Sequence, residues 1–335
     1  MEEIQDPLAQ VLRGGVTLDA LKAAVDDSGY LLQTTVAELL ADDFVIQPEW
    51  GYRDRVTGDM RTIDLLAVRE LRIVKSSKSR VRAHLVLILE CKQSELPYVF
   101  FRDRRSFVPA FPTVCGLRRN RIVVKTDDDR SVWSYSPLQA LELDLVPFVV
   151  EPPGCSVLAR VARRGQTLEL TGTDAYQRLV MPLMSAVAHF KKASRPPKTA
   201  FWFDAYLVVP VAVLAAPMAA AKVVGDQTEL ELTKWERLYR HEPHGSRGFS
   251  GHLGQLKVID AVHHEFFSTY LRDHLLPYSQ RFGDLALKHN HELATGKAFA
   301  SGLGRNSANI ESRMKPRSVV VGPPARLPPK KRGKL

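Results

Sequence analysis

The chain contains 335 residues, 45% of them hydrophobic, and carries a formal net charge of +10 at pH 7. This composition is normal for a globular protein and allows one large domain or two ordinary ones. The three cysteines are widely spaced, which argues against a disulfide framework and against a CxxC metal site. The acidic first residues lack the apolar stretch of a signal peptide, so we expect a cytoplasmic protein.

The positive charge is concentrated at the C-terminus. From Leu303 onward, nine Lys or Arg residues and one acid give a net charge of +8, which leaves +2 for the rest of the chain. A basic tail can bind a polyanion non-specifically, but a segment rich in Gly and Pro is also typical of a solvated, disordered end. The overall charge therefore does not by itself establish a nucleic-acid partner.

The first hundred residues predict a helix followed by three strands. Helical spacing covers residues 17–43, with a break expected at Gly29. Three extended segments follow, at residues 44–53, 61–69 and 83–91. Pro48 favours an edge position for the first of them. The third is a continuous apolar run, which predicts a central strand covered on both faces.

The second half of the sequence predicts further strands and helices. We expect strands at 200–213, 230–239 and 256–262, helices at 174–192 and 264–289, and a short helix running into a strand at 138–150. The uncharged segment 205–221 is short for a membrane span and contains Pro210 and Pro217. It is interpreted as a strand, a turn and the start of a helix.

This pattern divides the chain into three parts. Residues 1–195 are expected to form the first domain, and residues 303–335 a disordered basic tail. Residues 196–302 either extend the sheet of the first domain or form a second α/β lobe.

The candidates for chemistry are an aspartate and a Glu-x-Lys triplet on successive strands. Asp64 lies on the second predicted strand, and Glu90, Cys91 and Lys92 end the third. Because strand side chains alternate between faces, Glu90 and Lys92 point to one side and Cys91 to the other. If the two strands are neighbours, the carboxylates of Asp64 and Glu90 converge on one point.

This convergence predicts a metal site. The carboxylates of Asp64 and Glu90 and the main-chain carbonyl of Cys91 are hard oxygen ligands of the kind that Mg²⁺ prefers, and Mn²⁺ is expected to substitute for it. Lys92 would then act either as a base or as a fixed charge that orients the attacking water. A metal ion at this position offsets charge on a phosphate and makes hydroxide available, which predicts phosphodiester hydrolysis.

These residues resemble the PD-(D/E)XK nuclease superfamily. The signature here is Arg61-Thr62-Ile63-Asp64, then twenty-five residues, then Glu90-Cys91-Lys92. The resemblance implies a restriction-endonuclease-like α/β fold, in which a helix, a hairpin, a strand with the triplet and a further helix build a mixed, largely antiparallel sheet flanked by helices. It also implies a glutamate ligand on the first helix, for which Glu38 is the candidate.

The resemblance covers about residues 31–101 and has some departures. Gln93 follows the triplet, as in some Mrr-like restriction enzymes, which implies that it supports Lys92. Ile63 replaces the name-giving proline, and Pro97 interrupts the helix expected after the triplet. DNA is the implied substrate, with RNA not excluded, and restriction, anti-phage defence and DNA repair are the associated roles. Cutting two strands often uses two sites, so a homodimer is an open alternative.

Basic residues near the triplet are candidates for gripping phosphates. Arginines interleaved with aromatic side chains can contact the backbone and stack on bases, although an ordinary solvated loop has a similar composition. The candidate nucleic-acid contacts are Arg61, Lys78, Arg80, Arg102, Arg104, Arg105, Arg118 and Arg119.

Two other functions remain open at this point. The protein could be an inactive, nuclease-like module that binds nucleic acid without cleaving it. It could also be a structural or interaction protein in which the carboxylates form surface ion pairs with Lys92 and Arg61.

Overall fold

A computed structural model describes residues 16–54, 57–72, 79–102, 111–126, 132–242, 255–301 and 309–314. The strands of its large sheet are β1 (Val45–Arg53), β2 (Met60–Glu70), β3 (Val81–Gln93), β4 (Tyr98–Arg102), β5 (Thr113–Cys115), β8 (Gly154–Arg164), β9 (Thr167–Thr171), β10 (Phe203–Ala215), β11 (Met218–Val224), β12 (Gln227–Leu232), β13 (Trp235–Glu242) and β14 (Gln255–His263). Within the described residues these twelve strands have the order β1-β2-β3-β10-β14-β13-β8-β4-β11-β12, with β5 beside β10 and β9 beside β8. A small sheet has the order β15 (Lys297–Ala300), β6 (Ile122–Thr126) and β7 (Val132–Tyr135).

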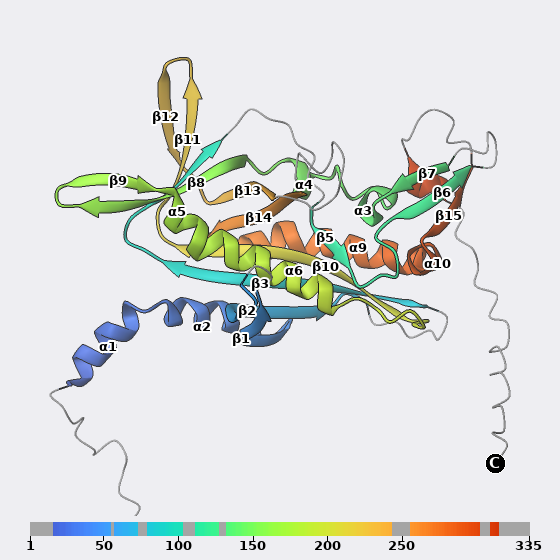
Figure 1. Ribbon diagram of the computed structural model, residues 1–335, viewed down its shortest axis with the longest axis horizontal. Helices are drawn as coiled ribbons and strands as arrows, with labels where there is room; N and C mark the ends of the chain where they lie inside the picture. The colour runs from blue at the N-terminus through green and yellow to red at the C-terminus, as the bar shows by residue number, and fades with distance from the viewer. Residues whose placement is uncertain are drawn as a thin grey trace, which may run out of the picture.

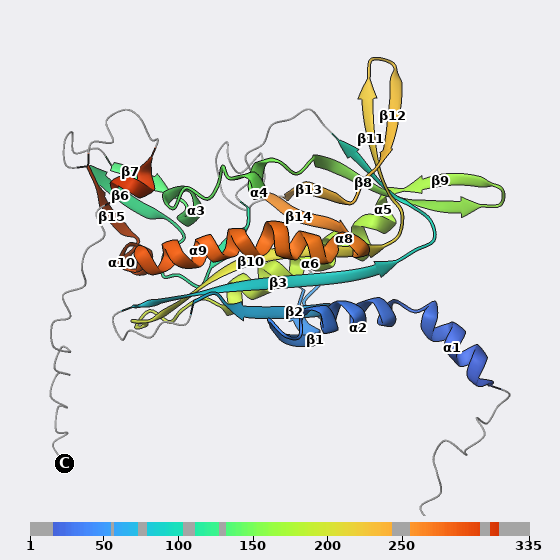
Figure 2. The same ribbon diagram turned by 180° about the vertical axis from the view of Figure 1, so that it is seen from behind.

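Helices cover both faces of the large sheet. The N-terminal and central helices are α1 (Leu18–Asp26), α2 (Gly29–Leu40), α3 (Pro137–Ala140), α4 (Pro147–Val150), α5 (Gly172–Ala175), the π-helical turn η2 (Tyr176–Val180) and α6 (Met181–Ala193). The C-terminal ones are α8 (His264–Thr269), the π-helical turn η3 (Tyr270–Leu275), α9 (Leu276–Lys288), α10 (Asn290–Thr295) and α11 (Ile310–Arg313). Helix α6 lies over one face (Figure 1) and α9 over the other (Figure 2). The expected α/β class, with a large mixed sheet flanked by helices, is confirmed.

Alternation along β3 separates two buried cores. Leu85, Leu87 and Leu89 pack with α2, α8 and α9 on one face, whereas Val86 and Ile88 pack with α6 on the other. All five side chains are fully buried. The continuous apolar run therefore gives a central strand covered on both faces, since neither set of side chains can be left in water.

Strand β10 joins the two halves of the chain. It runs parallel to β3 and pairs with it along the whole length, from Phe203 beside Val81 to Ala215 beside Gln93. Parallel neighbours need a crossover connection, and α6 lies between the two strands in sequence and packs on both. The boundary drawn at residue 195 therefore does not coincide with a break in the sheet, because β10 to β14 extend the sheet that begins with β1 to β3.

Two prolines lie where the ladder can accept them. Pro48 is on β1, which is an edge strand of the sheet. Pro210 is on the central strand β10, at the point where the partner on one side changes from β5, which ends opposite Val208, to β14, which begins opposite Val211. A proline lacks the N–H that a continuous ladder would require, so a change of partner is a suitable place for it.

Several predicted elements are wrong in detail. The segment after Pro217 is the strand β11 and does not begin a helix, because it pairs with β4 and β12. Residues 230–239 belong to two strands, which separate at Thr233 and Lys234. Residues 138–150 contain the short helices α3 and α4 in place of a helix and a strand, each with a proline in its first turn.

None of the helices in the described ranges has the length and apolarity needed to span a bilayer. The uncharged run around Pro210 is instead the interior of the sheet, where most of β10 is buried.

A fully buried ion pair lies between β13 and β14. The guanidinium of Arg237 donates to both carboxylate oxygens of Asp260, at 2.7 and 2.9 Å, and to the carbonyls of Phe148 and Val149. The hydroxyl of Tyr270 also donates to Asp260, at 2.9 Å. Burial lowers the pKa of Arg237, but the charge of Asp260 outweighs this effect and the net shift is upward. Arg237 therefore retains its charge inside the core.

We expect Asp260→Ala to lower the free energy of unfolding by about 3–5 kcal/mol, because it leaves the Arg237 charge buried without a partner. Urea denaturation followed by circular dichroism measures this change. The control is Glu169→Ala, which removes an exposed partner of Arg164 and should have little effect. Equal stability of the two variants would contradict the prediction.

Candidate functional site

The site forms where β2 and β3 end their antiparallel pairing. The ladder reaches Leu65 and Leu89, so Asp64 and Glu90 come next on their strands. Here the Asp64 carboxylate takes the place of a ladder acceptor: its Oδ2 accepts the main-chain N–H of Cys91 at 2.6 Å. This bond holds Asp64 beside the Glu-x-Lys triplet.

Lys92 joins the two carboxylates. Its Nζ lies 2.5 Å from Oε1 of Glu90 and 4.0 Å from Oδ2 of Asp64. The Glu90 side chain is only 7% exposed, whereas Asp64 and Lys92 keep 21% and 29% of their surface. The structure thus brings Asp64, Glu90 and Lys92 together on the α6 side of the sheet, with one buried and two accessible members.

Burial dominates the electrostatics of these groups. It raises the pKa of Glu90 from 4.5 to about 7, although Lys92 acts in the opposite direction. Burial also raises the pKa of Asp64, against the effects of Lys92 and of the Cys91 N–H. For Lys92 burial lowers the pKa, but the charges of Glu90 and Asp64 outweigh it and the net shift is upward. Lys92 therefore stays protonated at neutral pH, which favours a fixed positive charge over a base.

Gln33 connects helix α2 to the site. Its side chain is buried, and its Nε2 donates to the main-chain carbonyl of Asp64 and to Oε1 of Glu49, both at 2.9 Å. Gln33 stands next to the apolar stripe that packs α2 on the sheet, so its position is fixed by the core. The sequence offered little signal for it, since a glutamine beside an apolar stripe is usually solvated.

Glu49 contributes a third carboxylate that the sequence analysis did not single out. It stands opposite Asp64 in the β1–β2 register, and its charge is among the causes that raise the pKa of Asp64 and of Glu90. Its φ of 49° lies in the left-handed region, which costs a non-glycine residue about 1–3 kcal/mol. The bond from Gln33 helps to hold this strained conformation.

Two tyrosines flank the carboxylates. Tyr52 on β1 is buried, and burial raises its pKa to about 12. Tyr98, which begins β4, is buried and lies close enough to Lys92 and Arg160 to feel both charges. Among the described residues, the hydroxyl of Tyr52 and Oε2 of Glu90 are buried without a hydrogen-bond partner. The described residues contain seven further atoms of this kind, but Oε2 of Glu90 lies at the point where the two carboxylates and Lys92 meet.

A pair of arginines lies beyond Tyr98. Arg160 on β8 and Arg178 in η2 both bind Asp174, at 3.2 and 2.6 Å. Arg160 also donates to the hydroxyl of Ser94, two residues after Lys92, at 3.4 Å. Two guanidiniums share one carboxylate here, so a net positive charge remains near the site. The sequence did not reveal this pair, because Arg160 and Arg178 are distant from the triplet along the chain.

Two residues expected in the site lie elsewhere. Glu38 is exposed, two positions from the buried Val36 and therefore about 200° around the helix from it. Gln93 lies on the face opposite Lys92 and donates to the carbonyl of Asp26 at the end of α1, so it does not contact Lys92.

The predicted nucleic-acid residues are dispersed. Arg61 lies near the site, with its Nε 3.8 Å from Asp54. Arg102 binds the buried Glu236 at 2.5 Å and also contacts Glu231, so its charge is neutralised and the expected phosphate contact is corrected to a structural ion pair. Arg80 and Arg118 lie near the N-terminal ends of β3 and β10, whereas the carboxylates lie near the C-terminal end of β3. Arg119 is the next residue after Arg118. The predicted contacts Lys78, Arg104 and Arg105 lie outside the described residues.

The described residues hold no group of three or more His, Cys, Asp or Glu side chains placed to bind a metal ion. Asp64 and Glu90 form a pair, with the Cys91 backbone beside them. No protein-family model, curated protein or solved structure matches the chain.

We expect the stability of the metal-free protein to depend on Glu90 between pH 4.5 and 8. Because the pKa in the folded state is about 7 and the usual value is 4.5, the folded protein binds this proton more tightly. The resulting stability is fully present below about pH 4.5 and is lost as the pH rises through 7. The wild type should therefore lose roughly 3 kcal/mol relative to Glu90→Gln across this range.

Chemical denaturation in EDTA at several pH values measures this difference. The control is Glu169→Gln, whose carboxylate is exposed and should give a profile parallel to that of the wild type. A parallel profile for Glu90→Gln as well would contradict the assigned pKa shift.

Proposed function

We propose that the protein is a metal-dependent phosphodiesterase of the restriction-endonuclease-like class that acts on DNA. The observation that carries this proposal is the convergence of Asp64, Glu90 and Lys92 where β2 and β3 part, with Asp64 fixed by the N–H of Cys91. The order of α2, the β1–β2 hairpin and β3 with its triplet agrees with the core expected from the resemblance. The further helix, α6, comes only after β4 to β9, and it precedes a strand parallel to β3.

The carboxylate oxygens of Asp64 and Glu90 are suitable ligands for a divalent cation that would take part in the hydrolysis. Asp64 and Glu90 would hold the ion through carboxylate oxygens, and the buried, unpartnered Oε2 of Glu90 is suited to a cationic partner. When bound, the ion supplies charge neutralisation at the phosphate and lowers the pKa of a water molecule. Glu49 lies opposite Asp64 and increases the negative potential that attracts such an ion.

Lys92 has a positioning role in this proposal. Its pKa is shifted upward, so it remains an ammonium that donates to Glu90 and offsets the repulsion between the two carboxylates. Its exposed portion faces the solvent side of the site, where it would orient a water molecule or bind a phosphate oxygen. Arg160 and Arg178, near Tyr98, are placed to bind the phosphate backbone beside the scissile bond.

We expect the wild type to cleave plasmid and linear DNA with Mg²⁺ or Mn²⁺. The cleavage rate of Lys92→Ala should be lower by about 100-fold or more, which is the usual effect of removing one charged or hydrogen-bonding group that stabilises a transition state. Gel electrophoresis measures the cleavage. The control is Lys222→Ala, which removes an exposed lysine on β11 far along the chain from the triplet. Equal cleavage by the wild type and Lys92→Ala would contradict the proposal that Lys92 belongs to a nuclease active site.

A titration of melting temperature with Mn²⁺ tests the site independently of turnover. A ligand that binds only the folded state at 100 times its Kd stabilises it by about 2.7 kcal/mol, so the melting temperature should rise. We expect the rise to disappear in Asp64→Asn. A wild type that shows no rise supports the structural alternative, in which Glu90 and Lys92 are only a buried ion pair. A rise with DNA binding but no cleavage supports the inactive, nuclease-like alternative.

A further inference from the structure

A basic groove lies at the opposite end of β3 and β10 from the carboxylates. Its cavity has a volume of about 460 Å³ and is lined by the loop after β5 and by the chain that leaves α6. The charged residues in its lining are Arg118, Arg119, Lys191, Arg195 and Lys198, and we call this set the basic groove. The lining contains no acidic residue, and among the described residues none of the five pairs with a carboxylate.

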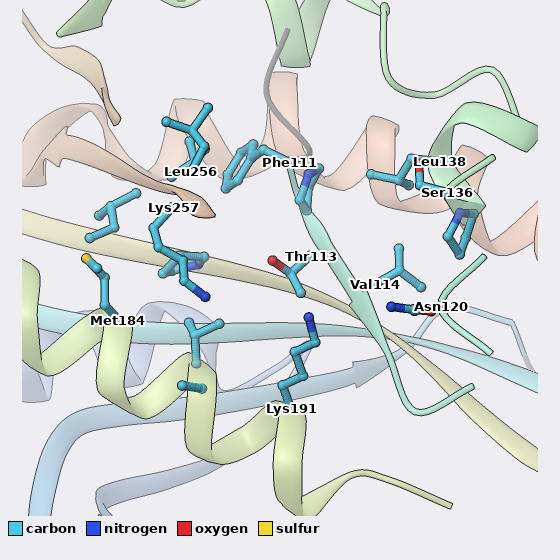
Figure 3. Close-up of a pocket in the computed structure, with 17 residues that line it drawn as sticks. Phe111, Thr113, Val114, Asn120, Ser136, Leu138, Met184, Lys191, Leu256 and Lys257 are labelled. Atoms are coloured by element: carbon cyan, nitrogen blue, oxygen red, sulfur yellow. The ribbon is translucent and has the colours of Figure 1, made fainter. Parts of the chain in front are cut away.

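The groove continues into a second cavity of about 370 Å³. The two cavities share Val114, Asn120, Pro137 and Lys191 in their linings. Figure 3 shows Lys191, from α6, and Lys257, from β14, extending toward the region around Thr113. This cavity also has no acidic lining residue, so positive charge extends along the joined space.

Two exposed aromatic side chains follow the groove lining in the chain, directly after Ala200, whose carbonyl accepts from Arg118. Phe201 and Trp202 are 57% and 53% exposed and stand edge to face, with ring centres 5.6 Å apart. We call them the aromatic rim. The run Phe201-Trp202-Phe203 is by its sequence more typical of a core segment than of a base-stacking platform, but only Phe203 enters the core. Two adjacent exposed aromatic rings form a contiguous apolar patch, which can serve as a contact surface.

The arginines hold the rim in place. The guanidinium of Arg118 donates to the carbonyl of Lys198 at 2.6 Å, and Nε of Arg80 donates to the carbonyl of Phe201 at 3.0 Å. Arg80 also stacks over the Phe201 ring at 3.9 Å from its centre. Arg80 and Arg118 lie close enough for their charges to repel. Burial is the larger cause that lowers the pKa of Arg80, and the charge of Arg118 is the second. Like charges held together by carbonyls form a preorganised anion site.

Gly116 fixes the loop that carries Arg118 and Arg119. Its φ is +83°, and a Cβ at this position would lie 1.9 Å from the carbonyl oxygen of Asp204. Any larger residue would therefore push the loop away from β10. The groove is a consequence of this close approach of two backbones and not of a flexible surface loop.

We propose that the basic groove and the aromatic rim bind a single-stranded polynucleotide. The cations contact successive phosphates, and Trp202 stacks on an unpaired base, a combination that recurs in proteins that bind single strands. A duplex has its bases stacked inside, so it could not use the aromatic rim. The concave space also suits a nucleotide-sized group better than the convex backbone of a duplex.

The groove is separate from the proposed active site. Phe203, next to the aromatic rim, pairs with Val81, and Leu214 pairs with Lys92, so eleven steps of parallel strand, about 36 Å, separate the rim from Lys92. Binding at the groove therefore does not depend on the proposed cleavage chemistry. A test in EDTA distinguishes failure of this inference from failure of the nuclease proposal.

The test is fluorescence anisotropy of the full-length protein with a labelled twelve-residue oligothymidylate in EDTA at several salt concentrations. We expect Trp202→Ala to weaken binding about 5- to 100-fold, as loss of one stacked base does. Arg195→Ala with Lys198→Ala should reduce the slope of log affinity against log salt by about 1.4, since two phosphate contacts are lost. Circular dichroism and the melting temperature verify that each variant is folded.

Matched controls remove the same kinds of side chain elsewhere. Tyr30→Ala deletes an exposed aromatic side chain, and Arg163→Ala with Lys222→Ala deletes two exposed charges; both should bind like the wild type. Duplex DNA and heparin of equal charge serve as competitors. If they compete as well as the oligothymidylate and Trp202→Ala has no effect, the groove is only a polyanion site and the proposal is overturned.

The basic C-terminal residues are present in every variant and could themselves bind the oligonucleotide. Crosslinking is therefore used to locate the bound strand. An oligothymidylate with one 5-iododeoxyuridine is irradiated with the protein, and the adduct is mapped by mass spectrometry after proteolysis. We expect the adduct on the peptide that contains Trp202. Adducts confined to residues 303–335, or no adduct at all, would overturn the proposal.

Discussion

The pairing of β3 with β10 determines where everything else in the molecule lies. Thirteen residues of each strand run side by side in parallel, and both strands are almost entirely buried. A parallel pair must be covered on both faces, so α6 is required on one side and α2 with α8 and α9 on the other. Because the two strands begin and end together, the pair also defines two ends of the sheet with different chemistry.

At one end, the cost of burying charge shapes the site. Asp64 leaves the ladder to accept the Cys91 N–H, and Glu90 is left under α6 with Lys92 as its partner. A buried pair of this kind is rarely a gain in stability, because desolvation of the two ions offsets their attraction. The strained φ of Glu49 adds a further cost at the same point. Costs concentrated in one place are typical of a site kept for function, which is the physical basis of the nuclease proposal.

At the other end, none of the five cations of the basic groove pairs with a carboxylate among the residues that the structure describes. The loop fixed by Gly116 and the chain after α6 bring arginines and lysines around two joined cavities, next to an exposed tryptophan. The aromatic rim and Lys92 are about 36 Å apart along these strands, so a polynucleotide bound at the rim would lie at a defined distance from Lys92. The length of a hydrogen-bonded strand pair does not change when a ligand binds, so this distance along β3 and β10 would stay fixed.

The sequence by itself determined the local elements and the pair of strands that carry the chemistry. The alternation around Asp64 and the apolar run into Glu90 predict strands because side-chain burial has a period of two, and α2 follows from its 3.6-residue stripe. Only the tertiary structure decided which helix residue reaches the site, because Glu38 and Gln33 differ by their angle around α2 and that angle depends on the packing of its neighbours. It also decided that Glu49, Arg160 and Arg178 surround the triplet and that Trp202 is exposed beside the basic groove, since long-range strand register leaves no trace in local spacing.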